Sequence, residues 1–201
     1  MLAFKGFTKD LTCIRGERIF RYEPGVLYTA DKSKCARTGF HCTENPLECL
    51  DWYALGGGNR YYIVEAGGNI DEDGKDAKIS CTQIRLVEEL SIPALVYHAL
   101  VYMVKHPLRD WEKTGRMLEV RRDVAQADKK EAIAIARGEN PRVRGSAGAV
   151  LGLVVERGGQ IKTTKLFIIP GPGEKRKGKA VWGKPDTWYT LDENRQLKEV
   201  Y

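Results

Sequence analysis

Apolar and polar positions alternate in short runs over residues 1–90, with turn residues between the runs. An alternation of period two is typical of β-strands, whose successive side chains point to opposite faces. Residues 60–66 are the clearest case because they are rich in tyrosine, isoleucine and valine, and residues 77–88 predict a return strand. The Pro24-Gly25 pair suits a type II turn. Strands and turns are therefore expected to build most of this part.

One short helix is expected among these strands. Asn45 offers an N-cap side chain, Pro46 suits the first helical position, and Glu48 places a carboxylate three residues after the cap. Leucine, alanine and aromatic residues supply an apolar face over about two turns, and the glycines at 56–58 end the helix. An extended piece, residues 39–43, leads into the cap.

The spacing of apolar residues changes after residue 90. Between 91 and 105 they recur at helical intervals, which predicts a helix with one buried face. Pro107 breaks that helix, and the charged residues 111–124 are predicted to be helical as well. Residues 128–138 begin with a pattern that resembles a capping box and end in a glycine, which predicts a further helix.

Turn-bounded apolar runs return in the last third of the chain. Residues 145–155 and 161–169 predict a strand pair, and residues 187–191 and 197–201 predict a final hairpin. The sequence thus predicts an α+β fold in three parts: a mixed N-terminal domain over 1–90, a helical segment over 91–138, and a β-rich segment with a small antiparallel sheet over 139–201.

Charge changes the picture at one loop. The net charge is +6, but residues 38–90 hold four Lys/Arg against ten Asp/Glu, whereas residues 171–184 hold five against one. The basic residues of that loop are Lys175, Arg176, Lys177, Lys179 and Lys184. The first four are candidates for binding nucleic acid or an acidic partner. The alternative is a solvated loop, because no aromatic residue interleaves with these charges before Trp182.

The five cysteines all fall in the first half of the chain, and no two show C-x-x-C spacing. Free buried thiols are the favoured interpretation. A metal site formed by Cys35, His41, Cys42 and Cys49 is the alternative, but adjacent His41 and Cys42 would point to opposite faces of a strand. No metal is therefore predicted. No apolar stretch reaches the ~20 residues of a membrane span, and no signal peptide is recognisable, so we expect a soluble protein of the host cytoplasm.

Several motifs resemble those of a family of phage and prophage proteins with an N-terminal domain of unknown function. They are Phe4-Lys5-Gly6-Phe7, Tyr22-x-x-Gly25-x-x-Tyr28, Gly39-Phe40-His41-Cys42-x-Glu44-Asn45-Pro46-Leu47 and, near the end of the chain, Lys184-Pro185-Asp186-Thr187-Trp188-Tyr189-Thr190-Leu191. Many relatives carry an Ala/Ser/Gly repeat array between the two parts, which this chain lacks. The resemblance implies an origin in a mobile element and does not imply a reaction.

A weaker resemblance concerns ADP-ribosyltransferases. Residues 38–43, the following helix and the strand from Tyr61 are similar to the elements that flank the NAD pocket of those enzymes. The resemblance implies that Lys5 and Thr43 would contact NAD and that Glu88 or Glu89 would be the catalytic carboxylate. The family usually has Arg or His where this chain has Lys5. His41 is a further candidate, as an acid or base near neutral pH.

Each of these residues also has a purely structural interpretation. His41 would be a half-buried strand residue bonded to backbone, Thr43 would cap the turn, and Lys5, Glu88 and Glu89 would be solvated strand charges. The sequence therefore favours a phage accessory protein that binds a host protein or nucleic acid, with counter-defence as one such role. A cofactor is not expected. The alternative is an ADP-ribosyltransferase-like enzyme that uses NAD.

Overall fold

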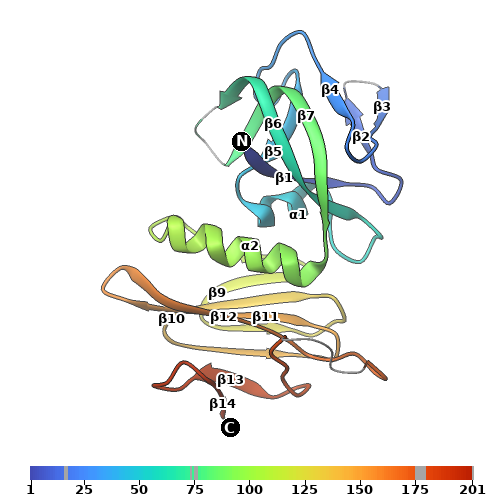
Figure 1. Cartoon of the computed structure of the whole chain (residues 1–201). Helices are drawn as coiled ribbons and strands as arrows, with labels where there is room; N and C mark the ends of the chain where they lie inside the picture. The colour runs from blue at the N-terminus through green and yellow to red at the C-terminus, as the bar shows by residue number, and fades with distance from the viewer. Residues whose placement is uncertain (16–17, 73, 75–76, 175–179, 201) are drawn as a thin grey trace. The chain divides into compact units, whose positions relative to one another are not determined.

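The computed structural model describes residues 1–15, 18–72, 74, 77–174 and 180–200. The chain divides into two compact units, Met1–Leu95 and Val96–Tyr201. Strands dominate both of them (Figure 1), which corrects the predicted α+β class. None of the described helices is long and apolar enough to cross a membrane.

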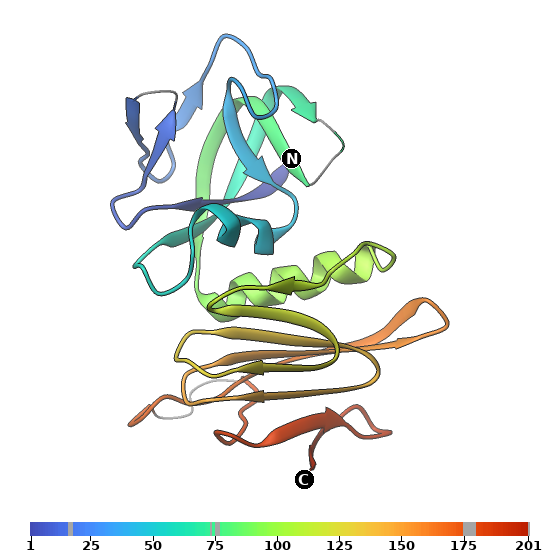
Figure 2. The same cartoon turned by 180° about the vertical axis from the view of Figure 1, so that it is seen from behind.

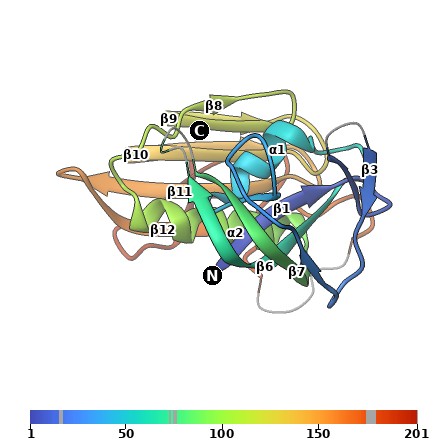
Figure 3. The same cartoon turned by 90° about the horizontal axis from the view of Figure 1, so that it is seen from above.

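Four strands of the N-terminal unit close into a small antiparallel barrel. β1 and β7 each pair with both β5 and β6, so that every one of the four has a partner on each side. β6 and β7 are the longest and run side by side (Figure 3). The strands of this unit are β1 (Leu2–Phe7), β2 (Thr12–Arg15), β3 (Arg18–Arg21), β4 (Leu27–Thr29), β5 (Phe40–Thr43), β6 (Arg60–Glu72) and β7 (Lys78–Leu90).

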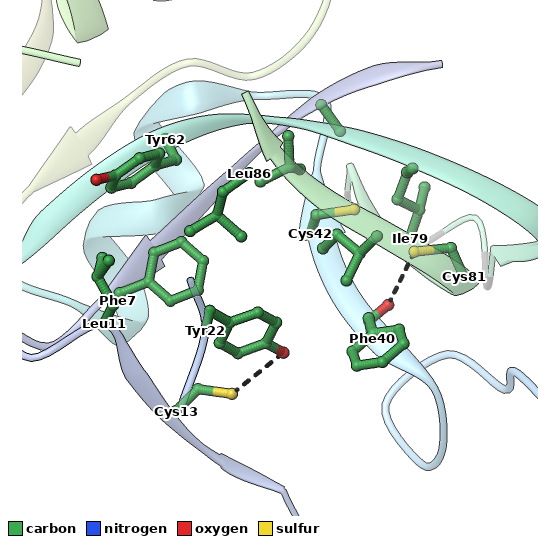
Figure 4. Packing of buried hydrophobic residues seen from close by; sticks show 14 residues of the cluster. Phe7, Leu11, Cys13, Tyr22, Phe40, Cys42, Tyr62, Ile79, Cys81 and Leu86 are labelled. Atoms are coloured by element: carbon green, nitrogen blue, oxygen red, sulfur yellow. Dashed lines mark hydrogen bonds between the residues drawn. The ribbon is translucent and has the colours of Figure 1, made fainter. Parts of the chain in front are cut away.

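The barrel core is aromatic and sulfur-rich. Figure 4 shows Phe7 and Tyr22 side by side, with ring centroids 5.1 Å apart in an edge-on contact. Phe40 lies 6.2 Å from Tyr22 in a similar arrangement, and the thiols of Cys42 and Cys81 lie beyond it. Offset and edge-on ring pairs stabilise a core beyond the burial of their area.

The predicted N-cap is confirmed at the entry to a short helical segment. Asn45 Oδ1 accepts a hydrogen bond from the Leu47 N–H at 3.2 Å. Pro46–Glu48 form a 3₁₀ turn, and Cys49–Trp52 continue it as α1. The Glu48 carboxylate accepts a hydrogen bond from the side-chain amide Nδ2 of Asn45 at 3.3 Å, while the Asn45 backbone N–H donates to the Thr43 hydroxyl at 3.1 Å.

Three parallel strands form the centre of the C-terminal unit: β9 (Leu118–Ala127), β10 (Ile133–Gly145) and β11 (Val150–Arg157). The chain returns from β9 to the start of β10 over residues 128–132. A straight ten-residue strand is ~33 Å long, whereas five linking residues span at most ~18 Å. The strands must therefore bend, and the register break between Arg137 and Arg142 marks the bend.

The bend needs a glycine. Gly138 lies beside Asp123, and a Cβ at Gly138 would overlap the carboxylate of that residue. Asp123 itself has a φ of 62°. β9 and β10 thus turn at the same level, and each folds back on itself as one coil of a short solenoid.

Both faces of β10 are buried, but by different partners. Ala134 and Ala136 face the inside of the coil, where Ala125, Val143 and Leu151 surround them. Ile133 and Ile135 point the other way. On that side α2 (Ile92–Lys105) lies along the parallel strands (Figures 1 and 2), and Leu100 of this helix reaches Gly152 of β11.

The structure overturns the predicted helical segment over 91–138. Only α2 is helical there, while β8 (Lys113–Thr114), β9 and the first part of β10 are strands. A run that is apolar at every position suits a strand buried on both faces as well as a helix, and periodicity cannot separate the two. Asp128 and Glu131, which resemble a capping box, lie in the link between two strands.

The predicted C-terminal hairpins are present, but they extend the parallel strands into one mixed sheet. β12 (Gln160–Ile168) pairs antiparallel with β11, and β13 (Trp188–Leu191) pairs with β14 (Leu197–Val200) and with β10. The small antiparallel sheet expected over 139–201 is therefore not a separate layer.

Candidate functional site

A cleft of about 570 Å³ lies in the C-terminal unit, at the bends of β9 and β10 and the carboxyl end of β11. Residues 107–112, which follow α2, and the turn at Gly158-Gly159 complete its walls. Its volume is in the range of clefts that bind small ligands or a few side chains. Five arginines line it: Arg109, Arg121, Arg122, Arg137 and Arg157.

The strand register brings these arginines together. Arg122 on β9 is directly opposite Arg137 on β10, although fifteen residues separate them in sequence. Side chains two apart share a face of a strand, so Arg137 lies on the same face as Ile133 and Ile135. The apolar positions of that face are buried, and the positions at the bend carry charge instead. The cleft begins where this change occurs.

Arg137 is a buried structural residue within the cleft. Only 9% of it is exposed, and its guanidinium forms an ion pair with Glu156. It also donates to the Pro107 carbonyl at 3.0 Å and lies 5.7 Å from the centre of the Trp111 ring. These contacts tie the segment after α2 to the strand ends and make one wall of the cleft rigid.

Arg122 and Arg157 differ from Arg137 because both are exposed. Within the described part of the chain, neither side chain has an ion-pair or hydrogen-bond partner. Arg121, in contrast, lies 3.5 Å from Glu119, and Arg109 donates to the Tyr102 hydroxyl at 3.0 Å. Arg122 and Arg157 are therefore the two guanidiniums free to bind an external anion.

Carboxylates also stand around the cleft. Asp110 accepts a hydrogen bond from the Glu112 N–H at 3.1 Å, and Glu156 is held by Arg137. Glu112 and Glu139 are exposed at the rim. The described lining contains no serine, cysteine, histidine or tyrosine. Its arginines and carboxylates are residue types that bind charged groups.

Lys5, His41 and Thr43 are located in the N-terminal barrel. Lys5 is 8% exposed and donates to the His41 carbonyl at 2.6 Å, while its ammonium lies 5.4 Å from the Phe7 ring centre. The Thr43 hydroxyl donates to Glu48 at 2.9 Å. The structure thus brings Lys5 to the backbone of His41 and uses Thr43 within the helix cap.

Glu88 and Glu89 lie near the end of β7. The register sets His41 opposite Ser80 and Glu88 opposite Ile63, so eight residues, or up to ~26 Å of strand, separate the two positions on β7. Glu89 accepts two hydrogen bonds from Arg60 and one from the Tyr62 hydroxyl. The Arg60 guanidinium lowers the pKa of Glu89.

The free buried thiols predicted from the sequence are present. All five cysteines are buried with free thiols, and the described residues contain no group of His, Cys, Asp or Glu that could hold a metal ion. Burial raises the pKa of the Cys49 thiol to about 12. The predicted basic residues Lys175, Arg176, Lys177 and Lys179 lie outside the described residues.

The cleft was missed by the sequence analysis. Its arginines are scattered along 109–157, and their proximity depends on the parallel register and on the bend in each strand. One signal was available. Arg137 and Arg157 each stand near the end of an apolar run, and a glycine follows each of them.

Residues 1–98 match a family model described as a domain of unknown function, DUF7666. This match agrees with the uncharacterised family that the N-terminal motifs resemble. No curated protein and no solved structure matches the chain. The arginine cleft lies outside the matched residues.

Proposed function

We propose that this is a binding protein that captures an anionic macromolecule through its arginine cleft. The single observation that carries the proposal is the pair Arg122 and Arg157, exposed in a cleft and without a partner among the described residues. The phage origin implied by the N-terminal motifs makes a host macromolecule the expected ligand, and interference with a host defence the expected consequence.

Two properties of the cleft support binding. Guanidinium groups recognise carboxylates and phosphates in a bidentate manner, and the buried Arg137–Glu156 pair gives the free arginines a rigid neighbour. Arg122 and Arg157 have no partner among the described residues, so binding an anion does not require an existing ion pair to break.

The NAD-dependent alternative has no comparable support. The side chains of Lys5 and Thr43 are engaged within the barrel, and Glu89 is held by Arg60. We expect no hydrolysis of NAD by the purified chain. Turnover that Glu88→Gln or Glu89→Gln abolishes would favour the enzyme instead.

The test compares binding by the full chain and by two double variants. Poly-L-glutamate and a single-stranded oligonucleotide serve as model anions, and thermal shift and fluorescence anisotropy report binding at low and raised salt. We expect at least one polyanion to bind, with an affinity that falls as salt rises. Arg122→Ala/Arg157→Ala should abolish that binding, whereas Arg21→Ala/Arg116→Ala removes the same charge from exposed positions outside the cleft and should retain it. Equal loss in both variants would contradict the proposal.

A further inference from the structure

We infer that the occupant of the arginine cleft is a short acidic segment of a protein, one that also presents an apolar side chain. This inference rests on the proposed function and gives its ligand a chemical class. Three features of the cleft favour such a segment over nucleic acid: the carboxylates at the rim, the inaccessible indole, and an exposed leucine.

The rim carboxylates oppose a continuous polyanion. Glu112 and Glu139 are exposed beside the free arginines, and a nucleic-acid strand carries a charge every ~3.4 Å along its length. If phosphates of a strand bound Arg122 and Arg157, the adjacent phosphates of that strand would therefore lie close to carboxylates. A peptide avoids this repulsion because its acidic side chains can be spaced by uncharged residues. Like charges arranged in this way commonly exclude the wrong partner.

The cleft also lacks a surface for base stacking. Proteins that bind single strands place successive bases on exposed aromatic rings. Trp111 is the only aromatic residue in the described lining, it is 7% exposed, and Arg137 lies over its ring. Leu108, in contrast, is 87% exposed in the same lining. An apolar side chain of a bound peptide would cover Leu108, and both apolar side chains would then be removed from water.

The arginines can each take one carboxylate. A planar guanidinium binds a carboxylate through two parallel hydrogen bonds, and Arg122 and Arg157 approach the cleft from different strands, β9 and β11. A segment with two acidic residues around an apolar one would meet both arginines and Leu108. The cleft volume of about 570 Å³ is sufficient for a few side chains of this kind.

The experiment uses fluorescence anisotropy with three labelled probes of equal length: an alternating Glu/Leu peptide, an alternating Gln/Leu peptide and oligothymidylate. We expect saturable binding of the Glu/Leu peptide only. Arg122→Ala and Arg157→Ala should each weaken it by about tenfold, and Leu108→Ser should weaken it less. Arg122→Lys/Arg157→Lys keeps the charge but loses the bidentate geometry. Its affinity for the Glu/Leu peptide should therefore lie between that of the unmodified chain and that of the alanine variants.

The rim is tested by Glu112→Lys/Glu139→Lys, which we expect to bind oligothymidylate at least tenfold more tightly than the unmodified chain does. If oligothymidylate binds the unmodified chain better than the peptide and depends on Arg122 and Arg157, the inference fails and the proposed function stands. If neither probe depends on these arginines, the proposed function fails with it. Equal binding of the Glu/Leu and Gln/Leu peptides would also overturn the inference, because it would show apolar contact without recognition of charge.

Discussion

The two units use similar side chains for opposite purposes. In the N-terminal barrel, the residues that suggest chemistry are engaged internally: Lys5 bonds to backbone, Thr43 bonds within the helix cap, and Glu89 bonds to Arg60. In the C-terminal coil, Arg137 is engaged in the same way, but Arg122 and Arg157 beside it have no partner among the described residues. A side chain that is engaged within the protein is not available to a ligand, whereas an exposed one without a protein partner is.

The two cores also differ in the size of the side chains that fill them. The barrel is filled by large rings such as Phe7 and Phe40, whereas the coil is filled mainly by alanines such as Ala134 and Ala136. Small side chains allow two arms of one coil to approach closely. That approach accompanies the bends of β9 and β10, where the register places Arg122 opposite Arg137.

The largest effect should come from the barrel core. Phe7→Ala removes a fully buried ring that contacts Tyr22 and Tyr62, and we expect a loss of about 3–5 kcal/mol in the free energy of unfolding. Urea denaturation measures it. Ile19→Ala, at a residue that is 78% exposed, is the control and should change stability by less than about 0.5 kcal/mol.

Arg137→Ala should destabilise the coil by about 3 kcal/mol, because it leaves the Glu156 carboxylate without its partner in a largely buried position. Urea denaturation again gives the value. The double variant Arg137→Met/Glu156→Leu removes both charges and should recover at least half of the loss. A double variant no more stable than the single one would show that packing of the arginine, and not its charge, is what matters.

Gly138→Ala should cost about 1–3 kcal/mol, because the new methyl group would overlap Asp123 at the bend. The control is Gly158→Ala, at a turn position with nothing within 4 Å of an added Cβ. That control has a φ of 59°, which other residues adopt at modest cost, whereas Gly138 has a φ of 152°, so the difference between the two reports the overlap together with the greater backbone strain at the bend. Equal costs would contradict the proposed close approach of β9 and β10.

The smallest effect concerns pH. The pKa of Glu89 is lower in the folded chain because Arg60 bonds to its carboxylate. The pair therefore stabilises the fold above the unfolded pKa of about 4.3, and this contribution is lost as the pH falls through the lower folded pKa. Glu89→Gln should remove less than about 1 kcal/mol at neutral pH, since the pair is exposed, and should have almost no effect under strongly acidic conditions. Urea denaturation of the unmodified chain and of Glu89→Gln, at neutral pH and under strongly acidic conditions, tests this prediction.

The local features of the fold were predictable from sequence and the long-range ones were not. Asn45 and Glu48 specify their cap within four residues, and the C-terminal hairpins follow from adjacent runs. Residues 118–124 of β9 and 133–138 of β10 were wrongly predicted to be helical, and the second run is apolar on both faces from Ile133 to Ala136. One face of this run is covered by α2, and the opposite face is covered by the second arm of the coil. Both partners are distant in sequence, so a short stretch of sequence does not reveal them.

In the candidate sites, too, local features were predictable from the sequence and long-range ones were not. Lys5, His41 and Thr43 were identified by motif resemblance, yet whether each side chain is engaged or free depends on neighbours such as Glu48 and the barrel rings. Arg122 and Arg157 carry no motif. Their proximity follows from the register of β9, β10 and β11, so only the folded chain reveals it.

Side-chain NMR of the arginine Nε–H groups during titration with the Glu/Leu peptide tests the contrast between the two units most directly. The account predicts that the signals of Arg122 and Arg157 shift in proportion to occupancy, while those of Arg60 and Arg85, which are paired in the barrel, stay in place. Shifts confined to the barrel arginines, or none at saturating peptide, would contradict it.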